Sequence, residues 1–79
     1  MENRRIPEPV LRSFEYLTAR YGGSVSYVGQ SKEGEVYTYV APADVDLGFP
    51  DVCVWDGAEA VGIGGYAALD ILRSVSKNS

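Results

Sequence analysis

The sequence predicts an α+β fold: a two-layer sandwich in which an antiparallel sheet of three or four strands carries two helices on one face. Three observations support this prediction. Apolar residues recur at helical spacing near each end, apolar and polar residues alternate between the ends, and the connections are rich in glycine and proline. Short connections favour antiparallel neighbours. We expect one domain over residues 1–79, in the order α-β-β-β-β-α, with residues 1–6 frayed.

The first helix is expected over residues 9–21. Its apolar residues recur at steps of four, three and four, which places them on one face of a helix. These residues are Val10, Phe14, Leu17 and Tyr21. Gly22 follows them and is expected to end the helix, because glycine readily adopts the positive φ found at helix C-termini.

Two strands joined by a polar loop are expected over residues 24–29 and 35–41. Side chains on the second strand alternate between the two faces of the sheet. One face then carries Val36, Thr38 and Val40, and the other carries Tyr37 and Tyr39. We expect the aliphatic face to lie on the helices, which leaves the tyrosine face open or covered by something else.

The stretch over residues 51–75 organises the rest of the chain. Residues 52–55 are β-branched and aromatic and indicate a strand. Asp56-Gly57 is typical of a type I′ turn, so residues 58–61 could pair back as a weak, alanine-rich strand. If residues 58–61 form a loop instead, the sheet has three strands. A glycine cluster then leads into a helix expected over residues 66–76.

The connector over residues 42–50 contains two prolines and a glycine, which exclude a long regular element. Its Val45, Leu47 and Phe49 are too apolar for a fully solvated loop, so we expect the connector to pack against the domain.

The charge pattern constrains the possible partners. The net charge is −4, and residues 33–72 contain eight acidic residues and no basic one. Nucleic acids require cationic surfaces, so this pattern argues against nucleic-acid binding. It is compatible with a basic protein partner, although a solvated acidic surface is the simpler interpretation. No run of apolar residues is long enough to span a membrane.

Cys53 is the only cysteine, and the chain contains no histidine. A disulfide within the chain is therefore impossible, and a single thiol in a strand fits a reducing compartment, so we expect a cytoplasmic protein. A buried thiol without a histidine base is expected to be structural rather than nucleophilic. No nucleophile–base set is recognisable, so we expect no enzymatic activity and no cofactor.

Two motifs resemble parts of known ligand sites but lack the other residues that those sites need. Gly62, Gly64 and Ala67 match the G-x-G-x-x-A spacing of dinucleotide-binding turns, but no following strand or acidic ribose ligand fits before residue 79. Asp44 and Asp46 begin a pattern like a calcium loop that lacks its later ligands. We therefore expect no metal site, and we interpret the glycines as a tight turn into the helix.

The tyrosines give the strongest functional indication. The chain has six tyrosines and one tryptophan, and tyrosine is common at interfaces because it combines a large ring with a polar hydroxyl. We expect an interaction face at Tyr27, Tyr37 and Tyr39. The alternative is that these tyrosines are half-buried residues that cover a small core.

Two functions therefore remain. The first is a non-enzymatic protein-interaction module that contacts another protein or a second copy of itself, as in a homodimer, through the tyrosine face or a strand edge. The second is a small-ligand or anion binder that uses the turn at Gly62, Gly64 and Gly65, whose backbone amides could face an anion.

Overall fold

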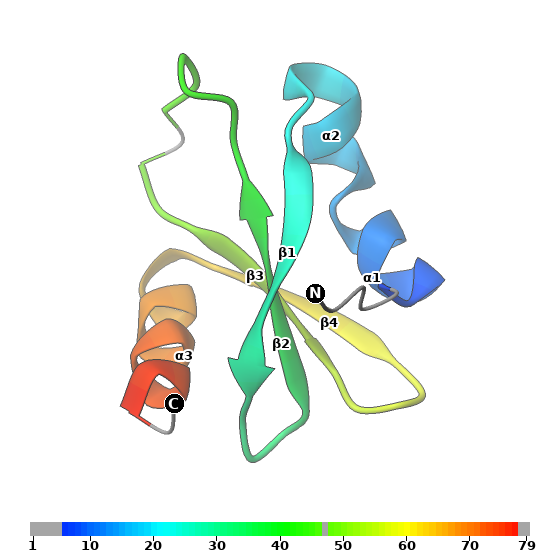
Figure 1. The fold of residues 1–79 in the computed structure, drawn as a ribbon, viewed down its shortest axis with the longest axis vertical. Helices are drawn as coiled ribbons and strands as arrows, with labels where there is room; N and C mark the ends of the chain where they lie inside the picture. Colours follow the sequence, from blue (N-terminus) through cyan, green and yellow to red (C-terminus); the bar gives the residue numbers. More distant parts are fainter. Residues whose placement is uncertain (1–5, 47, 78–79) are drawn as a thin grey trace, which may run out of the picture.

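In the part of the chain that the structure describes, a four-stranded antiparallel sheet with the order β1-β2-β3-β4 forms the centre of the fold, and three helices pack on it (Figure 1). The computed structural model describes residues 6–46 and 48–77. The elements are α1 (Glu8–Ser13), α2 (Glu15–Tyr21), β1 (Ser24–Gln30), β2 (Glu35–Val40), β3 (Asp51–Trp55), β4 (Ala60–Gly64) and α3 (Gly65–Lys77). The predicted α+β class and antiparallel sheet are confirmed, and the uncertain fourth strand is present.

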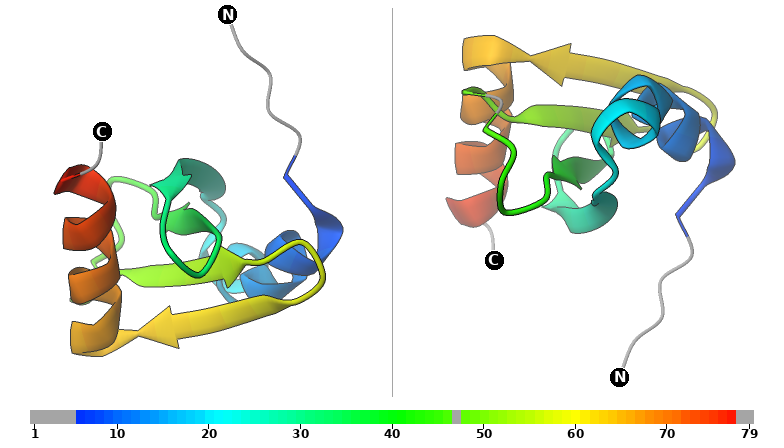
Figure 2. Two further views of the ribbon diagram at one scale, coloured as in Figure 1. Left: turned by 90° about the horizontal axis from the view of Figure 1, so that it is seen from below. Right: turned by 90° about the horizontal axis from the view of Figure 1, so that it is seen from above.

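The helices lie on opposite faces of the sheet, which corrects the prediction that both lie on one face. Tyr37 and Cys53 belong to the cluster under α1 and α2, whereas Val36 and Val52 belong to the cluster under α3. Figures 1 and 2 show α3 on one side of the sheet and α1 with α2 on the other. The cause is that β2 and β3 are apolar on both faces, so each face must be covered to remove it from water.

The predicted first helix is divided at Phe14, which has φ −105° and ψ 4°. Just before this point, the hydroxyl of Ser13 donates a 2.7 Å hydrogen bond to the carbonyl oxygen of Val10. The N–H of Phe14 bonds to the carbonyl oxygen of Leu11, three residues back. These local bonds tighten the last turn of α1 and let α2 start in a new direction.

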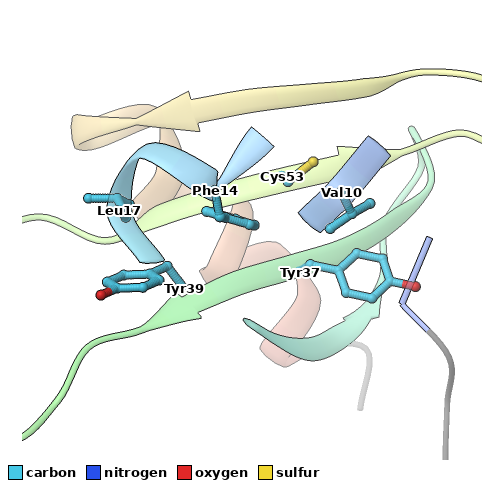
Figure 3. Close-up of a cluster of buried hydrophobic side chains, with 6 residues drawn as sticks. All are labelled: Val10, Phe14, Leu17, Tyr37, Tyr39 and Cys53. Carbon is cyan, nitrogen blue, oxygen red and sulfur yellow. The ribbon is translucent and has the colours of Figure 1, made fainter. Parts of the chain in front are cut away.

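The larger core cluster lies between α1, α2 and the sheet (Figure 3). The rings of Phe14 and Tyr39 are stacked, with their centroids 6.4 Å apart. Ile6, which lies in the range 1–6 that is expected to be frayed, packs against this cluster as a partly buried side chain. Residues 1–5, for which the same expectation was made, lie outside the described residues. The core on this face is therefore built from the N-terminal third of the chain and the tyrosine side of the sheet.

The hairpin between β3 and β4 differs from the predicted type I′ turn. Its central residues are Gly57 and Ala58, and only Gly57 has a positive φ, of 101°. The N–H of Asp56 donates to the carbonyl oxygen of Glu59, which closes the turn. A positive φ at the first central residue alone is the pattern of a type II′ turn, which also suits a two-residue hairpin loop.

Part of the connector between β2 and β3 packs against the rest of the domain. Val45 is half-buried, and the ring of Phe49 lies edge-on to Tyr66 with centroids 4.9 Å apart. Leu47, which was expected to pack with them, lies outside the described residues. The connector thus contacts the first turn of α3 through an aromatic pair.

Candidate interaction surface

The sheet face that carries the tyrosines is covered by α1 and α2. Tyr37 is 0 % exposed and Tyr39 is 7 % exposed, in the same cluster as Val10 and Leu17. The hydroxyl of Tyr37 donates a 2.8 Å hydrogen bond to a carboxylate oxygen of Glu35. The tyrosine face was expected to be open or covered by something else, and in the structure α1 and α2 cover it, because they bury their apolar side chains against the rings of Tyr37 and Tyr39.

Tyr27 is half-buried and lies at the margin of the same cluster. Its ring meets that of Tyr37 edge-on, with centroids 5.4 Å apart and an angle of 64° between the ring planes. The structure therefore brings two of the three predicted tyrosines into direct contact, with Tyr37 in the core and Tyr27 at its margin.

The predicted glycine turn is shorter than expected. Gly62 and Gly64 lie in β4, and Gly65 begins α3 with φ 67°. The change from strand to helix thus occurs at a single peptide bond, where the positive φ favours glycine. A carboxylate oxygen of Asp51 lies near Gly64, 3.2 Å from the position that a Cβ atom would occupy. The three glycines therefore form a strand end and a helix start, not a cradle of converging amides.

The β4 strand forms one edge of the sheet. Asp56 and Glu59 form the hydrogen-bonded pair that closes the hairpin. Because hydrogen-bonded and non-hydrogen-bonded pairs alternate along two antiparallel strands, the N–H and C=O groups of Val61 and Ile63 point toward β3. The residues of β4 that alternate with Val61 and Ile63 direct the same groups away from β3, along the outer edge. These outward residues are Ala60, Gly62 and Gly64.

The β4 strand also has no charged side chain along its whole length. Val61 is 50 % exposed, and Gly62 has no atom within 4 Å of the position that a Cβ atom would occupy. The sequence pattern predicted a strand here only up to residue 61 because glycine disfavours strands. The alternation of Val61 and Ile63 is the signal that could have extended the prediction to Gly64.

The face of the sheet under α3 is only partly covered. A pocket of about 460 Å³ opens there between α3, β3, β4 and the two nearby loops. We call it the α3 groove, and its lining residues are Glu33, Val54, Asp56, Val61, Ile63 and Ile71. Its floor is aliphatic and two carboxylates stand beside it. No residue of the groove was among the predicted site residues, because the prediction placed both helices on the same face.

Chemically reactive groups are few in the described part of the chain. Burial raises the pKa of the Cys53 thiol above its ordinary value, although hydrogen bonding with the Ser13 side chain and the Val61 backbone acts in the opposite direction. Within residues 6–46 and 48–77, no three His, Cys, Asp or Glu side chains gather in a way that could hold a metal ion. No helix in the same ranges is long and apolar enough to cross a membrane.

Comparisons with protein-family models, with curated proteins and with solved structures gave no match for this chain.

Proposed function

We propose that this chain is a non-enzymatic protein-interaction module that associates with a second copy of itself through the outer edge of β4. The observation that carries the proposal is the outward row of backbone groups at Ala60, Gly62 and Gly64, on a strand without charged side chains. Edge strands of this kind are templates for pairing with another strand.

The opposite edge of the sheet, β1, is protected in ways that β4 is not. The pairing of β1 with β2 shifts register between Tyr27 and Gly29, which is a β-bulge. The side chain of Val75 in α3 also lies close over Gly29. Bulges and covering helices are common means of blocking edge-to-edge pairing. The contrast favours β4 as the associating edge.

Two β4 strands can pair antiparallel about a twofold axis, the usual symmetry of homodimers. With Gly62 on the axis, Val61 of one copy falls opposite Ile63 of the other, so apolar side chains form a continuous row. In the same register, Glu59 falls opposite Gly65, at the start of α3. The first turn of α3 contains no acidic residue of its own, and a carboxylate is favourable at a helix N-terminus.

The proposed interaction suits a reducing compartment such as the cytoplasm, because Cys53 is an unpaired thiol. The alternative of an anion bound at Gly62, Gly64 and Gly65 has less support. A carboxylate oxygen of Asp51 lies beside Gly64, and the outward amides of Gly62 and Gly64 lie along an extended strand rather than converging on one point.

Light scattering after size exclusion, over a concentration series, tests the proposal. We expect the chain to dimerise as concentration rises. Gly62→Pro should shift the chain to monomer, because proline removes the outward N–H and leaves the pairing with β3 intact. Gly62→Ala is the matched control, since it retains the N–H and its methyl group enters open space.

Circular dichroism must show that both variants keep the fold. A chain that stays monomeric at every concentration would overturn the proposal. So would a dimer that folded Gly62→Pro forms as readily as Gly62→Ala, because another surface would then hold the copies together.

A further inference from the structure

We infer that the α3 groove binds a segment of another protein that carries an apolar side chain next to a lysine or arginine. The apolar side chain would contact Val61, Ile63 and Ile71, and the cation would lie beside Glu33 or Asp56. This inference goes beyond the proposed self-association, because it assigns a different partner and uses the sheet face rather than the backbone edge of β4, although the side chains of Val61 and Ile63 belong to both surfaces.

The groove exists because α3 leaves the hairpin end of β4 uncovered. Figure 2 shows α3 running across the strands at the end where β4 leads into it. There Val52 is 1 % exposed, whereas Val61, nearer the hairpin, is 50 % exposed. Between them the sheet and Ile71 of α3 form a concave apolar surface. A volume of about 460 Å³ lies within the range of pockets that bind ligands and anchor side chains.

The two charged side chains that line the groove itself, Glu33 and Asp56, are both carboxylates. A second hollow of about 250 Å³ shares Glu33 and Ile71 with the groove and adds Lys32 and Asp70. The two hollows are therefore bordered by three carboxylates and one ammonium group, and the carboxylate of Asp70 is paired with the guanidinium of Arg73 at 3.9 Å. An apolar surface with an acidic rim is complementary to a basic and apolar segment, and like-charge contacts would disfavour an acidic one.

The carboxylate of Asp56 is held in position as an anion. Its Oδ1 accepts hydrogen bonds of 2.8 Å from the backbone N–H groups of Ala58 and Glu59. A fixed charge loses less conformational entropy on binding than a flexible one, which favours its use in recognition. Within the turn this carboxylate therefore serves both the hairpin and the rim of the groove.

The groove and the β4 edge can be occupied together. Strand pairing adds a neighbour beside β4, in the plane of the sheet, whereas the groove lies above the sheet face that carries Val61 and Ile63. Loss of the outward N–H in Gly62→Pro should therefore leave the groove intact. Failure of self-association and failure of groove binding can thus be observed separately.

The experiment uses three synthetic peptides of equal length: one that alternates leucine with lysine, one that alternates leucine with glutamate, and one that alternates serine with lysine. We expect the leucine–lysine peptide alone to bind and to shift the amide signals of Val54, Ile63 and Ile71 in NMR spectra. Equal binding of the serine–lysine peptide would overturn the inference, since it would show charge attraction without the groove. Equal binding of the leucine–glutamate peptide would overturn the role of the acidic rim.

Paired variants locate the charges. The double variant Glu33→Gln with Asp56→Asn should weaken binding of the leucine–lysine peptide roughly three- to tenfold at low salt, the range for two exposed ion pairs. The control is Glu15→Gln with Asp44→Asn, which removes the same charge from exposed positions outside the groove. Equal weakening by both pairs would overturn the inference. Both double variants should dimerise as the unaltered chain does, so a change in peptide binding can be told apart from a change in the proposed self-association.

Discussion

The hydroxyl of Tyr39 donates a 2.7 Å hydrogen bond to the carbonyl oxygen of Gly22, which ties β2 to the end of α2. The Tyr39 ring is buried and stacks on Phe14. The hydrogen bond and the ring contact together join β2 to the N-terminal helices that cover the sheet. Gly22 ends α2 with φ 84° and directs the chain toward β1. This tyrosine therefore fixes the position of the N-terminal helices on the sheet.

Tyr39→Phe should lower the free energy of unfolding by about 1 kcal/mol, because it removes this hydrogen bond and keeps the ring. Urea unfolding followed by circular dichroism measures the change. Tyr21→Phe is the matched control, because the Tyr21 side chain is more exposed and should tolerate loss of its hydroxyl. Equal effects of the two variants would contradict the structural role of the Tyr39 hydroxyl.

Phe14→Ala should destabilise the domain by about 3–5 kcal/mol, since it removes a ring that is 2 % exposed from the centre of the larger core cluster. A domain of 79 residues has a total stability of roughly 4–12 kcal/mol, so this variant should lose a large share of its stability and melt at a clearly lower temperature. Leu11→Ala, at a position 45 % exposed on the same helix pair, should cost less than about 1 kcal/mol. A thermal melt of Phe14→Ala like that of the unaltered chain would contradict the core described above.

Gly34→Ala should destabilise more than Gly57→Ala, by about 1 kcal/mol or more. Both glycines have a positive φ that strains alanine. At Gly34, the added methyl group would also collide with the backbone carbonyl of Trp55, whereas at Gly57 it would enter open space. Urea midpoints of the two variants test the packing of the loop after β1 against the end of β3. A lower urea midpoint for Gly57→Ala than for Gly34→Ala would contradict this packing.

Asp56 should make the stability of the domain depend on pH in the acid range. Backbone N–H groups of Glu59 and Ala58 lower the pKa of Asp56 below its ordinary value of 3.8. A lowered pKa in the folded state means that this stabilisation is present above pH 3.8 and is lost as pH falls through the lower, folded-state value. The difference in unfolding free energy between the unaltered chain and Asp56→Ala should therefore shrink below pH 3.8.

Urea unfolding at neutral pH and at about pH 2.5 checks this dependence, since the second value lies below the ordinary pKa of a carboxyl group. Asp44→Ala is the control, because it removes an exposed carboxylate from the connector before β3. If the difference in unfolding free energy between the unaltered chain and Asp56→Ala grew as the pH fell, the stabilising role of the Asp56 carboxylate in the turn would be contradicted.

Local patterns were sufficient to locate most of the elements. The spacing of Val10, Phe14 and Leu17 predicted their common burial, and the alternation over residues 35–41 predicted β2 to within one residue. These features depend only on the periodicity of a helix or a strand. The division of the first helix at Phe14 was not predictable in this way, since the apolar spacing continues through it.

The position of the helices relative to the sheet could not be predicted from periodicity. Both faces of β2 are apolar, with Val36 on one and Tyr37 on the other, so the pattern does not say which helix covers which face. The sequence interpretation placed an interaction face at these rings because tyrosine is amphipathic, and it kept half-buried residues over a small core as the alternative. In the structure α1 and α2 bury the rings of Tyr37 and Tyr39 in the core instead. The surfaces proposed for interaction are therefore the edge of β4 and the α3 groove.

Amide hydrogen exchange at Gly62, measured by NMR at low and high protein concentration, tests the proposed association of β4 edges most directly. The outward N–H of Gly62 should exchange quickly in dilute solution and slowly in concentrated solution, whereas the N–H of Ile63, which faces β3, should be protected at both. Rapid exchange at Gly62 at every concentration, in a sample that light scattering shows to be dimeric, would contradict the proposal that β4 forms the interface.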